Sequence, residues 1–579
     1  MPAKQFSSTP LKVPQAIAKV LRECGIDMIF GVPGGNSMQI YDGLYDYRDE
    51  IRSILVRHES LAGVMAEVYG RLTGKPGVAI GQGLFMLSNA LLGVLEAKLG
   101  SSPLLILTDL TDGAPFSQHA PYQSGTGEYG NWDARASFFG VTKAVFESYL
   151  PVQAIQHTQL AIKHATSGRN GPIVVLYHSQ ALSGSLDNDS APRTFSTPNY
   201  LISTAPCIPP KTLEDVLKRM AEARKPVILA GNGVRLSRAC EELRRLAETL
   251  AAPVATSAAG KGVFAEDHPL ALGVFGTFGL PAANAWISDS DLILAIGTQL
   301  APSDTAFENP LLIDPARQTI IQIDIEPRNI GWTFPCDFAL HGDAAALMAQ
   351  LESSAAASGR FPPERLAERR EALRILRTRH GYFDEPEYTA DKTPLLPQRI
   401  ISEMMKALPA NAMITCDAGE NRLFMTRYFQ TRTAGSFLSP TATGGMGYAI
   451  PAALACKLVM PDRPAVAVCG DGGFAMSMNG MLTALEEGIP IVVVVMNNRA
   501  LGWVKHFQQE RVISSEFPDL DMAKIAQGMG CAGFRAETAE DLTSALEKSL
   551  KIDLPAVIDV ATSLDVSYRD ILSPLAKRD

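Results

Sequence analysis

Residues 464–503 read PAVAVCGDGGFAMSMNGMLTALEEGIPIVVVVMNNRALGW, and this stretch decides the fold. An apolar run over 465–469 ends in Gly-Asp-Gly-Gly, and the residues after it carry apolar side chains at helical spacing. Gly488 and Pro490 end that helical pattern, and a second apolar run over 491–496 follows. Two adjacent asparagines, Asn497 and Asn498, follow the second apolar run. The pattern predicts a strand, a turn, a helix and a second strand parallel to the first.

The polar residues of this stretch follow the carboxyl ends of the two predicted strands. Open parallel sheets bind ligands along that edge, so Asp471 and Asn498 can converge on one ion. A carboxylate, an amide oxygen and a backbone carbonyl are hard oxygen ligands that suit Mg²⁺ or Ca²⁺. The glycines beside Asp471 leave room for backbone N–H groups to approach a phosphate. The stretch therefore indicates a metal-bridged diphosphate site, although Gly-Asp-Gly alone also fits an ordinary turn.

Length and composition predict a large globular protein. The chain has 579 residues, of which 46% are hydrophobic and 20% charged, so we expect three or four domains. The net charge of −9 and the scattered Lys and Arg residues disfavour a nucleic-acid or anionic membrane partner. No apolar run approaches the roughly 20 residues that span a bilayer, and the polar residues 1–9 lack a signal-peptide core. Eight cysteines without a Cys-x-x-Cys pair indicate free thiols, so we expect a cytoplasmic protein.

Short apolar strands alternate with helical patterns in three blocks of the chain. This predicts an α/β protein with three doubly wound parallel sheets. The first and third blocks have similar size and rhythm, which indicates an internal duplication. The predicted order is a first domain over 1–182, a linker rich in Ser, Thr, Asn and Pro over 183–210, a central domain over 211–352, a connector over 353–397 and a third domain over 398–579.

Two turns of the first block carry candidate functional residues. Pro33, Gly34 and Gly35 form a strand-to-helix turn, and Glu59 stands where a strand gives way to a helix. Each has an ordinary structural interpretation, because glycines serve tight turns and a glutamate at a helix start is favoured by the helix dipole. Position alone therefore does not separate structure from catalysis at these residues.

Taken together, the motifs resemble the thiamine-diphosphate enzymes of the acetohydroxyacid synthase, pyruvate oxidase and benzaldehyde lyase superfamily. The Gly-Asp-Gly to Asn-Asn stretch is similar to their diphosphate-and-metal motif. The Pro-Gly-Gly turn with Glu59 resembles their pyrimidine-binding domain. Two further segments, 417–421 and 443–453, match the places where the family holds diphosphate oxygens and a bulky apolar residue under the cofactor. The resemblance covers essentially the whole chain, in the family's order.

The resemblance implies a pyrimidine-binding, a central and a diphosphate-binding domain around thiamine diphosphate and Mg²⁺. It implies that the side chains of Asp471 and Asn498 and the carbonyl of Ala500 bind the metal. The residues that it places at the coenzyme are Pro33, Gly34, Glu59, Gly419, Glu420, Asn421, Gly445, Met446, Gly470, Asp471, Gly472, Gly473, Asn498, Ala500, Leu501 and Gly502.

The family chemistry gives two of these residues distinct roles. The coenzyme supplies the carbanion, and a carboxyl group at its pyrimidine nitrogen promotes the tautomer that forms it. We assign that role to Glu59, which works best with its pKa raised by apolar surroundings. Met446 is the predicted wedge that bends the coenzyme, with core packing as the alternative. In this family Glu59 and the metal site come from different subunits, so a homodimer or homotetramer is implied.

Departures from the family pattern surround the expected substrate side. Asn36 stands where acetohydroxyacid synthases have a small residue and benzaldehyde lyase has His, and it is expected either to bond a substrate or to cap a helix. Gln82 replaces a proline in a longer loop. The segment 117–132 lacks the family's Phe-Gln pair, and the sequence does not choose a replacement. Glu59, Asn36 and Gln82 are the predicted catalytic residues.

The leading functional interpretation is an acetolactate-synthase-type carboligase acting on a 2-oxo acid or acyloin with an aldehyde or ketone acceptor. The run over 501–504 favours it, whereas His-Phe-Gln-Gln at 506–509 resembles benzaldehyde lyase. An acyloin lyase or 2-oxo-acid decarboxylase is therefore the alternative, followed by a flavin-dependent oxidase and a non-catalytic paralogue. FAD is the less favoured alternative, because Gly231 and Gly233 are weak evidence and residues 299–309 lack the family's Arg-Phe-Asp-Asp run.

Overall fold

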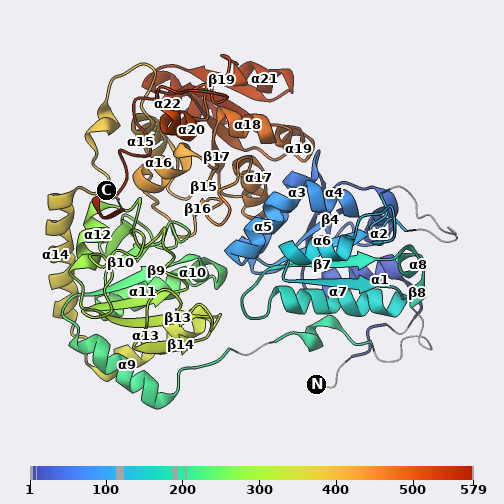
Figure 1. Cartoon of the computed structure of the whole chain (residues 1–579), viewed down its shortest axis with the longest axis horizontal. Helices are drawn as coiled ribbons and strands as arrows, with labels where there is room; N and C mark the ends of the chain where they lie inside the picture. Colours follow the sequence, from blue (N-terminus) through green and yellow to red (C-terminus); the bar gives the residue numbers. More distant parts are fainter. Residues whose placement is uncertain (1–3, 8, 113–122, 187–193, 203–204, 577–579) are drawn as a thin grey trace. The chain divides into compact units, whose positions relative to one another are not determined.

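Three sheets of six parallel strands form the framework of the protein, with helices on their faces (Figure 1). This arrangement confirms the predicted α/β class with parallel sheets. A short antiparallel pair joins β1 (Leu11–Lys12) to β8 (Ser185–Leu186). The computed structural model describes residues 4–7, 9–112, 123–186, 194–202 and 205–576.

The first sheet has the strand order β3-β2-β4-β5-β7-β6. Its inner strands are almost wholly buried apolar runs, as expected for parallel strands with helices on both faces. Helices α1 and α7 cover one face and α3 and α5 the other (Figure 1). The strands are β2 (Met28–Gly31), β3 (Arg52–Leu55), β4 (Gly77–Gln82), β5 (Leu104–Asp109), β6 (Ala144–Ser148) and β7 (Pro172–Tyr177). The helices are α1 (Val13–Glu23), η1 (Gly35–Ser37), α2 (Met38–Tyr45), α3 (Glu59–Thr73), α4 (Gly83–Ser88), α5 (Leu91–Gly100), α6 (Ala134–Val141), α7 (Pro151–Ala165), α8 (Ser179–Leu182) and η2 (Thr197–Tyr200).

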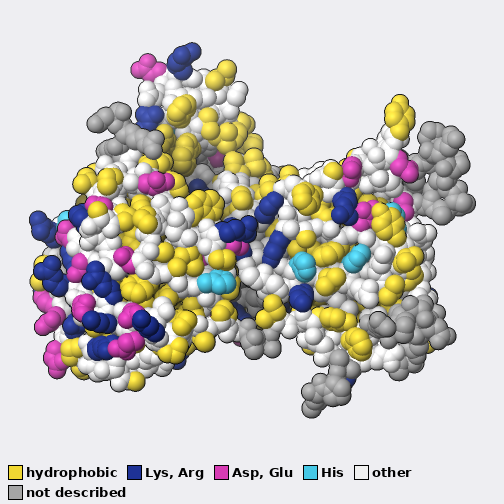
Figure 2. Space-filling view, turned by 60° about the horizontal axis from the view of Figure 1, so that its bottom comes forward, with side chains coloured by type: hydrophobic (Ala, Val, Ile, Leu, Met, Phe, Trp, Pro, Cys, Tyr) yellow, Lys and Arg dark blue, Asp and Glu magenta, His cyan; other side chains and the backbone are white. Residues whose placement is uncertain are grey.

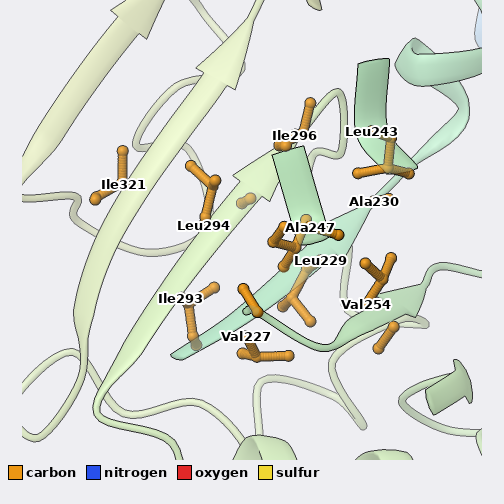
Figure 3. Close-up of a cluster of buried hydrophobic side chains, with 14 of the residues drawn as sticks. Val227, Leu229, Ala230, Leu243, Ala247, Val254, Ile293, Leu294, Ile296 and Ile321 are labelled. Carbon is orange, nitrogen blue, oxygen red and sulfur yellow. The ribbon is translucent and has the colours of Figure 1, made fainter. Parts of the chain in front are cut away.

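The second sheet has the order β11-β10-β9-β12-β13-β14. Figure 3 shows Leu243 and Ala247 of α11 gathered with Leu229 and Ala230 of β9 in its core. The strands are β9 (Pro226–Ala230), β10 (Val254–Thr256), β11 (Ala271–Val274), β12 (Leu292–Ile296), β13 (Thr319–Asp324) and β14 (Phe338–His341). The helices are α9 (Pro210–Glu222), α10 (Asn232–Leu236), α11 (Cys240–Leu250), α12 (Pro281–Ser288), α13 (Ala344–Ser358) and α14 (Pro363–His380).

The third sheet has the order β16-β15-β17-β18-β20-β19. Counted along the chain, this is the order of the first sheet, whereas the central sheet has a different one. The shared order is what an internal duplication would leave. The strands are β15 (Met413–Cys416), β16 (Phe437–Leu438), β17 (Ala465–Gly470), β18 (Val492–Asn497), β19 (Ala532–Ala536) and β20 (Ala556–Ala561). The helices are η3 (Pro386–Thr389), α15 (Pro397–Ala407), α16 (Glu420–Tyr428), α17 (Ala449–Val459), α18 (Asp471–Ser477), α19 (Gly480–Glu486), α20 (Gly502–Gln508), α21 (Met522–Gly528), α22 (Ala539–Ser549) and η4 (Pro574–Ala576).

The turn predicted after β17 is in fact the first turn of a helix. β17 ends at Gly470, and α18 begins at Asp471, whose Oδ1 accepts a hydrogen bond from the Gly472 N–H at 2.8 Å. Bonding of this kind satisfies one of the free N–H groups at a helix start, so no separate turn is needed. The helical stretch is broken into α18 and α19, and Met478, which lies between them, is 36% exposed, whereas Met481 is buried.

The chain forms two compact units. Residues 1–203, 454–459 and 477–487 form the first, and the remaining residues, with the second and third sheets, form the second. The predicted domain boundaries stay predictions. Within the second unit, the buried Lys261 Nζ lies 2.8 Å from Glu266 Oε1, and Glu266 Oε2 accepts a bond from the Thr431 N–H at 2.7 Å. This ion pair links the central segment to the segment that leads into β16.

The surface agrees with the charge distribution of the sequence. Figure 2 shows acidic and basic side chains interspersed over the displayed face. In the described part of the chain, no helix is long and apolar enough to cross a membrane. All eight cysteines are free, as predicted, and Cys416, Cys456, Cys469 and Cys531 are buried, whereas Cys207 is exposed.

Removing one partner of the Lys261–Glu266 pair should strongly destabilise the protein. In Glu266→Ala the buried ammonium group of Lys261 loses its counter-charge, so we expect the free energy of unfolding to fall by about 3–5 kcal/mol. Denaturant unfolding of the wild type and of Glu266→Ala measures this change in free energy. Glu241→Ala, which removes an exposed partner of Arg244, is the control and should change little. Equal stability of the Glu266 variant and the wild type would contradict the assignment.

Candidate active site

A cavity of about 120 Å³ lies at the carboxyl ends of β15, β17 and β18 in the second unit. The strand order of the third sheet reverses between β15 and β17, which is where open parallel sheets bind ligands. Gly470 pairs with Met496 in the β17–β18 register, and this brings Asp471 beside the asparagines that follow β18. Of the coenzyme contacts predicted between residues 419 and 502, all but Gly445 line this cavity: Gly419, Glu420, Asn421, Met446, Gly470, Asp471, Gly472, Gly473, Asn498, Ala500, Leu501 and Gly502.

Asp471 is a buried acid with an unsatisfied oxygen. Its Oδ1 accepts the Gly472 N–H, but no hydrogen-bond partner lies within reach of its Oδ2 among the described residues. Burial raises the pKa of Asp471 to about 6, although the backbone N–H groups of Gly472, Arg499 and Ala500 oppose this. A buried acceptor without a partner costs free energy unless a cation or donor reaches it. The cavity wall therefore offers a carboxylate oxygen suited to a metal ion.

The turn after β18 brings the other two predicted metal ligands to the same place. Arg499 adopts a left-handed conformation with φ 57°, and the Ala500 N–H donates to Asn498 Oδ1 at 3.1 Å. An amide oxygen has two lone pairs, so Asn498 retains one for a metal. A Cβ placed on Gly502 would lie 2.9 Å from Asn498 Nδ2, so a side chain there would crowd the asparagine.

The cavity lining also includes a side-chain donor suited to an anion. Asn421 Nδ2 is buried and has no hydrogen-bond partner among the described residues. It stands in the first turn of α16, whose free N–H groups add partial positive charge. Met446 borders the same space, since a Cβ placed on Gly472 would lie 3.0 Å from its terminal methyl carbon. The cavity lining thus combines a carboxylate oxygen and an amide donor, both without a hydrogen-bond partner among the described residues, with an apolar side chain.

Asp417, the first residue of the segment 417–421, has a structural role of its own. The sequence places it in the segment that holds diphosphate oxygens, but its buried carboxylate accepts the N–H groups of Ala418, Gly447 and Tyr448 at 2.9–3.2 Å. Burial raises its pKa to about 6, and these bonds oppose the rise. Asp417 therefore ties the turn that carries Met446 to the end of β15. An acid directly after a buried strand is compatible with both roles, so the sequence could not separate them.

The other predicted residues lie in the first unit. Glu59 begins α3 and is half-buried, and Asn89 Nδ2 donates to its Oε2 at 2.8 Å. Burial, with the nearby charge of Glu59, raises the pKa of Tyr41. Pro33 and Gly34 lie in the turn between β2 and η1. Sequence reasoning did not select Asn89, because its contact with Glu59 depends on the path of the loop before α5.

Asn36 and Gln82 belong to a polar cluster at the carboxyl edge of the first sheet. Asn36 caps neither η1 nor α2, so the helix-cap alternative is wrong; its Nδ2 donates to Ser179 Oγ at 2.7 Å. Gln82 Nε2 donates to Gln123 Oε1 at 2.5 Å. Residues 117–122 of the segment 117–132 lie outside the described residues, and Gln123 is the residue of its described part that reaches Gln82.

Asp109 is a member of this cluster that sequence reasoning missed. It is 1% exposed, and its Oδ2 accepts the Asn36 N–H at 3.2 Å and the N–H and hydroxyl of Thr111. Its Oδ1 has no partner among the described residues, and burial raises the pKa of Asp109. The signal was present in the sequence, since Asp109 directly follows the apolar run of β5.

The comparisons with known proteins identify the family. Three models of thiamine pyrophosphate enzymes match: the N-terminal TPP binding domain over residues 11–124, the central domain over 213–351 and the C-terminal TPP binding domain over 417–560. The protein named "Probable acetolactate synthase large subunit" of Methanocaldococcus jannaschii is 32% identical over 565 residues, 95% of this chain and 92% of its own. The chain belongs to the thiamine pyrophosphate enzymes. Acetolactate synthase large subunit of Corynebacterium glutamicum is 30% identical over 571 residues, 96% of this chain and 88% of its own. Acetolactate synthase of Mycobacterium avium is 29% identical over 563 residues, 95% of this chain and 87% of its own.

The cavity of this thiamine pyrophosphate enzyme fits the diphosphate end of its coenzyme. The unpartnered Asp471 Oδ2 is an acceptor for a metal ion, and the unpartnered Asn421 Nδ2 is a donor for a phosphate oxygen. Asn498 and the Ala500 carbonyl would complete the metal side. Asp471 would be the single acid among these metal ligands. Among the described residues, no three His, Cys, Asp or Glu side chains gather as a metal cluster.

Removing the charge of Asp471 should abolish metal-dependent binding of the coenzyme. In Asp471→Asn the cavity loses its anionic ligand, so we expect the affinity for thiamine diphosphate with Mg²⁺ to fall by more than about 100-fold. Isothermal titration with and without EDTA measures this. Asp553→Asn, an exposed change in the same unit, is the control and should bind as the wild type does. Metal-dependent binding that survives in the Asp471 variant would overturn the ligand assignment.

Proposed function

We propose that this thiamine-diphosphate-dependent enzyme is a carboligase of the acetolactate synthase type, which joins a 2-oxo acid donor to an aldehyde or ketone acceptor. One observation carries the proposal: the unpartnered Asp471 Oδ2 and Asn421 Nδ2 lie on the walls of one cavity at the strand-order reversal. The names of its relatives support the acetolactate version.

The residues of the chain would have separate roles at the bound coenzyme. Thiamine diphosphate, when bound, supplies the carbanion chemistry of its thiazolium ring. Asp471, Asn498 and the Ala500 carbonyl would hold Mg²⁺, and Asn421 would donate to the diphosphate. Met446 would set the bend between the two rings. Glu59, oriented by Asn89, would hold and exchange a proton at the pyrimidine nitrogen.

The polar cluster of the first unit is the proposed substrate side. Gln82 and Asp109 both flank Gly35, since a Cβ placed there would lie 3.2 Å from Gln82 Cγ and 3.3 Å from Asp109 Oδ2. Asn36 joins them through its backbone N–H. Amide and carboxyl groups suit the oxygen atoms of 2-oxo acids and acyloins. Gln82 and Asn36 are therefore proposed to orient the donor or acceptor carbonyl.

The assembly and location are also proposals. Large apolar side chains are exposed in the second unit, among them Met476 at 60%, Phe507 at 69% and Ile513 at 71%. Burial of such side chains against a second copy would stabilise a homodimer or homotetramer. The free thiols support a cytoplasmic location.

Product analysis separates the candidate reactions. We expect pyruvate to release CO₂ and to give a coupled hydroxy-keto product, because the proposed enzyme transfers the donor fragment to a second carbonyl. Chromatography of reactions with and without an aldehyde acceptor measures this. CO₂ release without a coupled product would support a decarboxylase, and cleavage of an acyloin as the main activity would support a lyase.

Glu59→Gln should lower the turnover of either reaction by at least about 100-fold, because the variant lacks the carboxyl group proposed to exchange a proton with the pyrimidine nitrogen. Unchanged turnover would refute the proposed role of Glu59.

Backbone hydrogen bonds at the strand-order reversal of the central sheet support the proposal that the enzyme does not bind FAD. At its strand-order reversal the Gly231 N–H donates to Ile296 O at 2.9 Å, and the Gly233 N–H donates to Gly297 O at 3.0 Å. In dinucleotide-binding folds the turn after the first strand approaches the pyrophosphate, whereas these glycines approach the turn after β12. We therefore expect the purified protein to lack the flavin absorption near 450 nm that a stoichiometric cofactor would give, about one flavin per chain. Stoichiometric flavin released on denaturation would contradict this.

A further inference from the structure

The half-buried His506 pairs with the buried Glu420 at the edge of the cavity. His506 lies on α20, and its Nδ1 is 2.8 and 2.9 Å from the two oxygens of Glu420. Glu420 is 5% exposed, opens α16 and lines the cavity. His506 Nε2 lies 2.8 Å from Leu564 O, and the Tyr568 N–H donates to Glu420 Oε1 at 2.8 Å. The pair therefore also holds the segment 564–568 against both helices.

Hydrogen-bond chemistry fixes how many protons this pair holds. A carbonyl oxygen only accepts, so His506 Nε2 must carry a hydrogen to bond to Leu564 O. The bond between Nδ1 and the carboxyl group needs one more proton, on either the imidazole or the carboxyl group. In both arrangements the pair as a whole is neutral. Glu420 is therefore not an isolated negative charge.

That neutrality matters because the cavity is proposed to hold an anion. The described residues that line it include two acids, Asp471 and Glu420, and no Lys, Arg or His. Asp471 would be neutralised by the metal ion. Glu420 stands between Gly419 and Asn421, on the diphosphate side, where an unneutralised carboxylate would repel the phosphates. Lys505, the neighbouring base on α20, is engaged by Glu516 at 2.8 Å.

We propose that His506 neutralises Glu420 by sharing one proton with it and that this positioning pair sets the affinity of the site for the diphosphate of the coenzyme. The proposal rests on the proposed function in one respect, that the cavity binds thiamine diphosphate. His506 does not touch the coenzyme and acts through Glu420. Its contribution is to let an acid stand at an anion site while holding α16, α20 and the segment 564–568 together.

A double-mutant cycle tests this on the full-length protein. The dissociation constant for thiamine diphosphate at fixed Mg²⁺ is measured by isothermal titration and by quenching of the fluorescence of Trp503, which lines the cavity. In His506→Gln the glutamate loses the partner that neutralises it, so we expect the dissociation constant to rise at least about tenfold, which corresponds to about 1.4 kcal/mol. In the double variant with Glu420→Gln the charge is gone, so binding should recover by at least about threefold relative to His506→Gln.

The recovery of affinity in the double variant distinguishes charge compensation from a purely structural role of the pair. If the pair served only to hold the helices, the double variant would bind no better than His506→Gln. Lys505→Gln removes a positive charge from the same helix without facing Glu420, so it is the matched control and should keep the wild-type constant. Inorganic pyrophosphate as a competitor should follow the same order of affinities as the coenzyme.

Several outcomes would overturn the proposal. Wild-type affinity in His506→Gln would do so, as would a double variant without recovery. If His506→Gln fails to fold, as judged by circular dichroism, His506→Asn, which also removes the basic group, takes its place. It should show the same tenfold loss of affinity, and wild-type affinity in that variant would contradict the proposal. A wild-type protein that does not bind the coenzyme would refute the proposed function itself, which distinguishes the two failures.

Discussion

A carboxylate buried at the end of a parallel strand needs a positive partner, and this constraint organises the site. The loss of water around Asp471 raises its pKa, while one of its oxygens finds no donor among the described residues. The protein could have paired this oxygen with a lysine, as it pairs Glu266 with Lys261. Asp471 instead lines the cavity, so a divalent cation is the partner that its surroundings favour.

The same sheet edge is used in different ways by the three sheets. The first and third sheets share one strand order and place polar side chains where that order reverses. The third presents Asp471 and Asn421, and the first presents Gln82 close to Asn36 and Asp109. The central sheet has another order, and its turns at the reversal bond to each other through Gly231, Gly233 and Gly297. An internal duplication would thus have supplied two edges with polar side chains, whereas the turns at this edge of the central sheet bond to each other.

Features set by local periodicity were predictable from the sequence. The buried strands appear as apolar runs, and the turns at their carboxyl ends follow, so Asp471 and Asn498 could be placed at one edge. The direct start of α18 was not predictable, because glycines permit a turn and a helix start equally. The roles of Asp417 and Asn36 depend on partners from remote segments, the 447–448 turn and Ser179, which no local pattern encodes. The Glu420–His506 pair depends in the same way on the path of residues 564–568.

The account depends most on one coenzyme being held by both ends of the chain. A crystal or cryo-electron microscopy structure of the assembled protein with thiamine diphosphate and Mg²⁺ would test this directly. We expect the Glu59 carboxyl group of one copy within hydrogen-bonding distance of the pyrimidine ring, with the diphosphate and the metal of that coenzyme bound at Asp471, Asn498 and Ala500. An assembly in which every Glu59 lies farther from every Asp471 than the coenzyme can span would contradict the account.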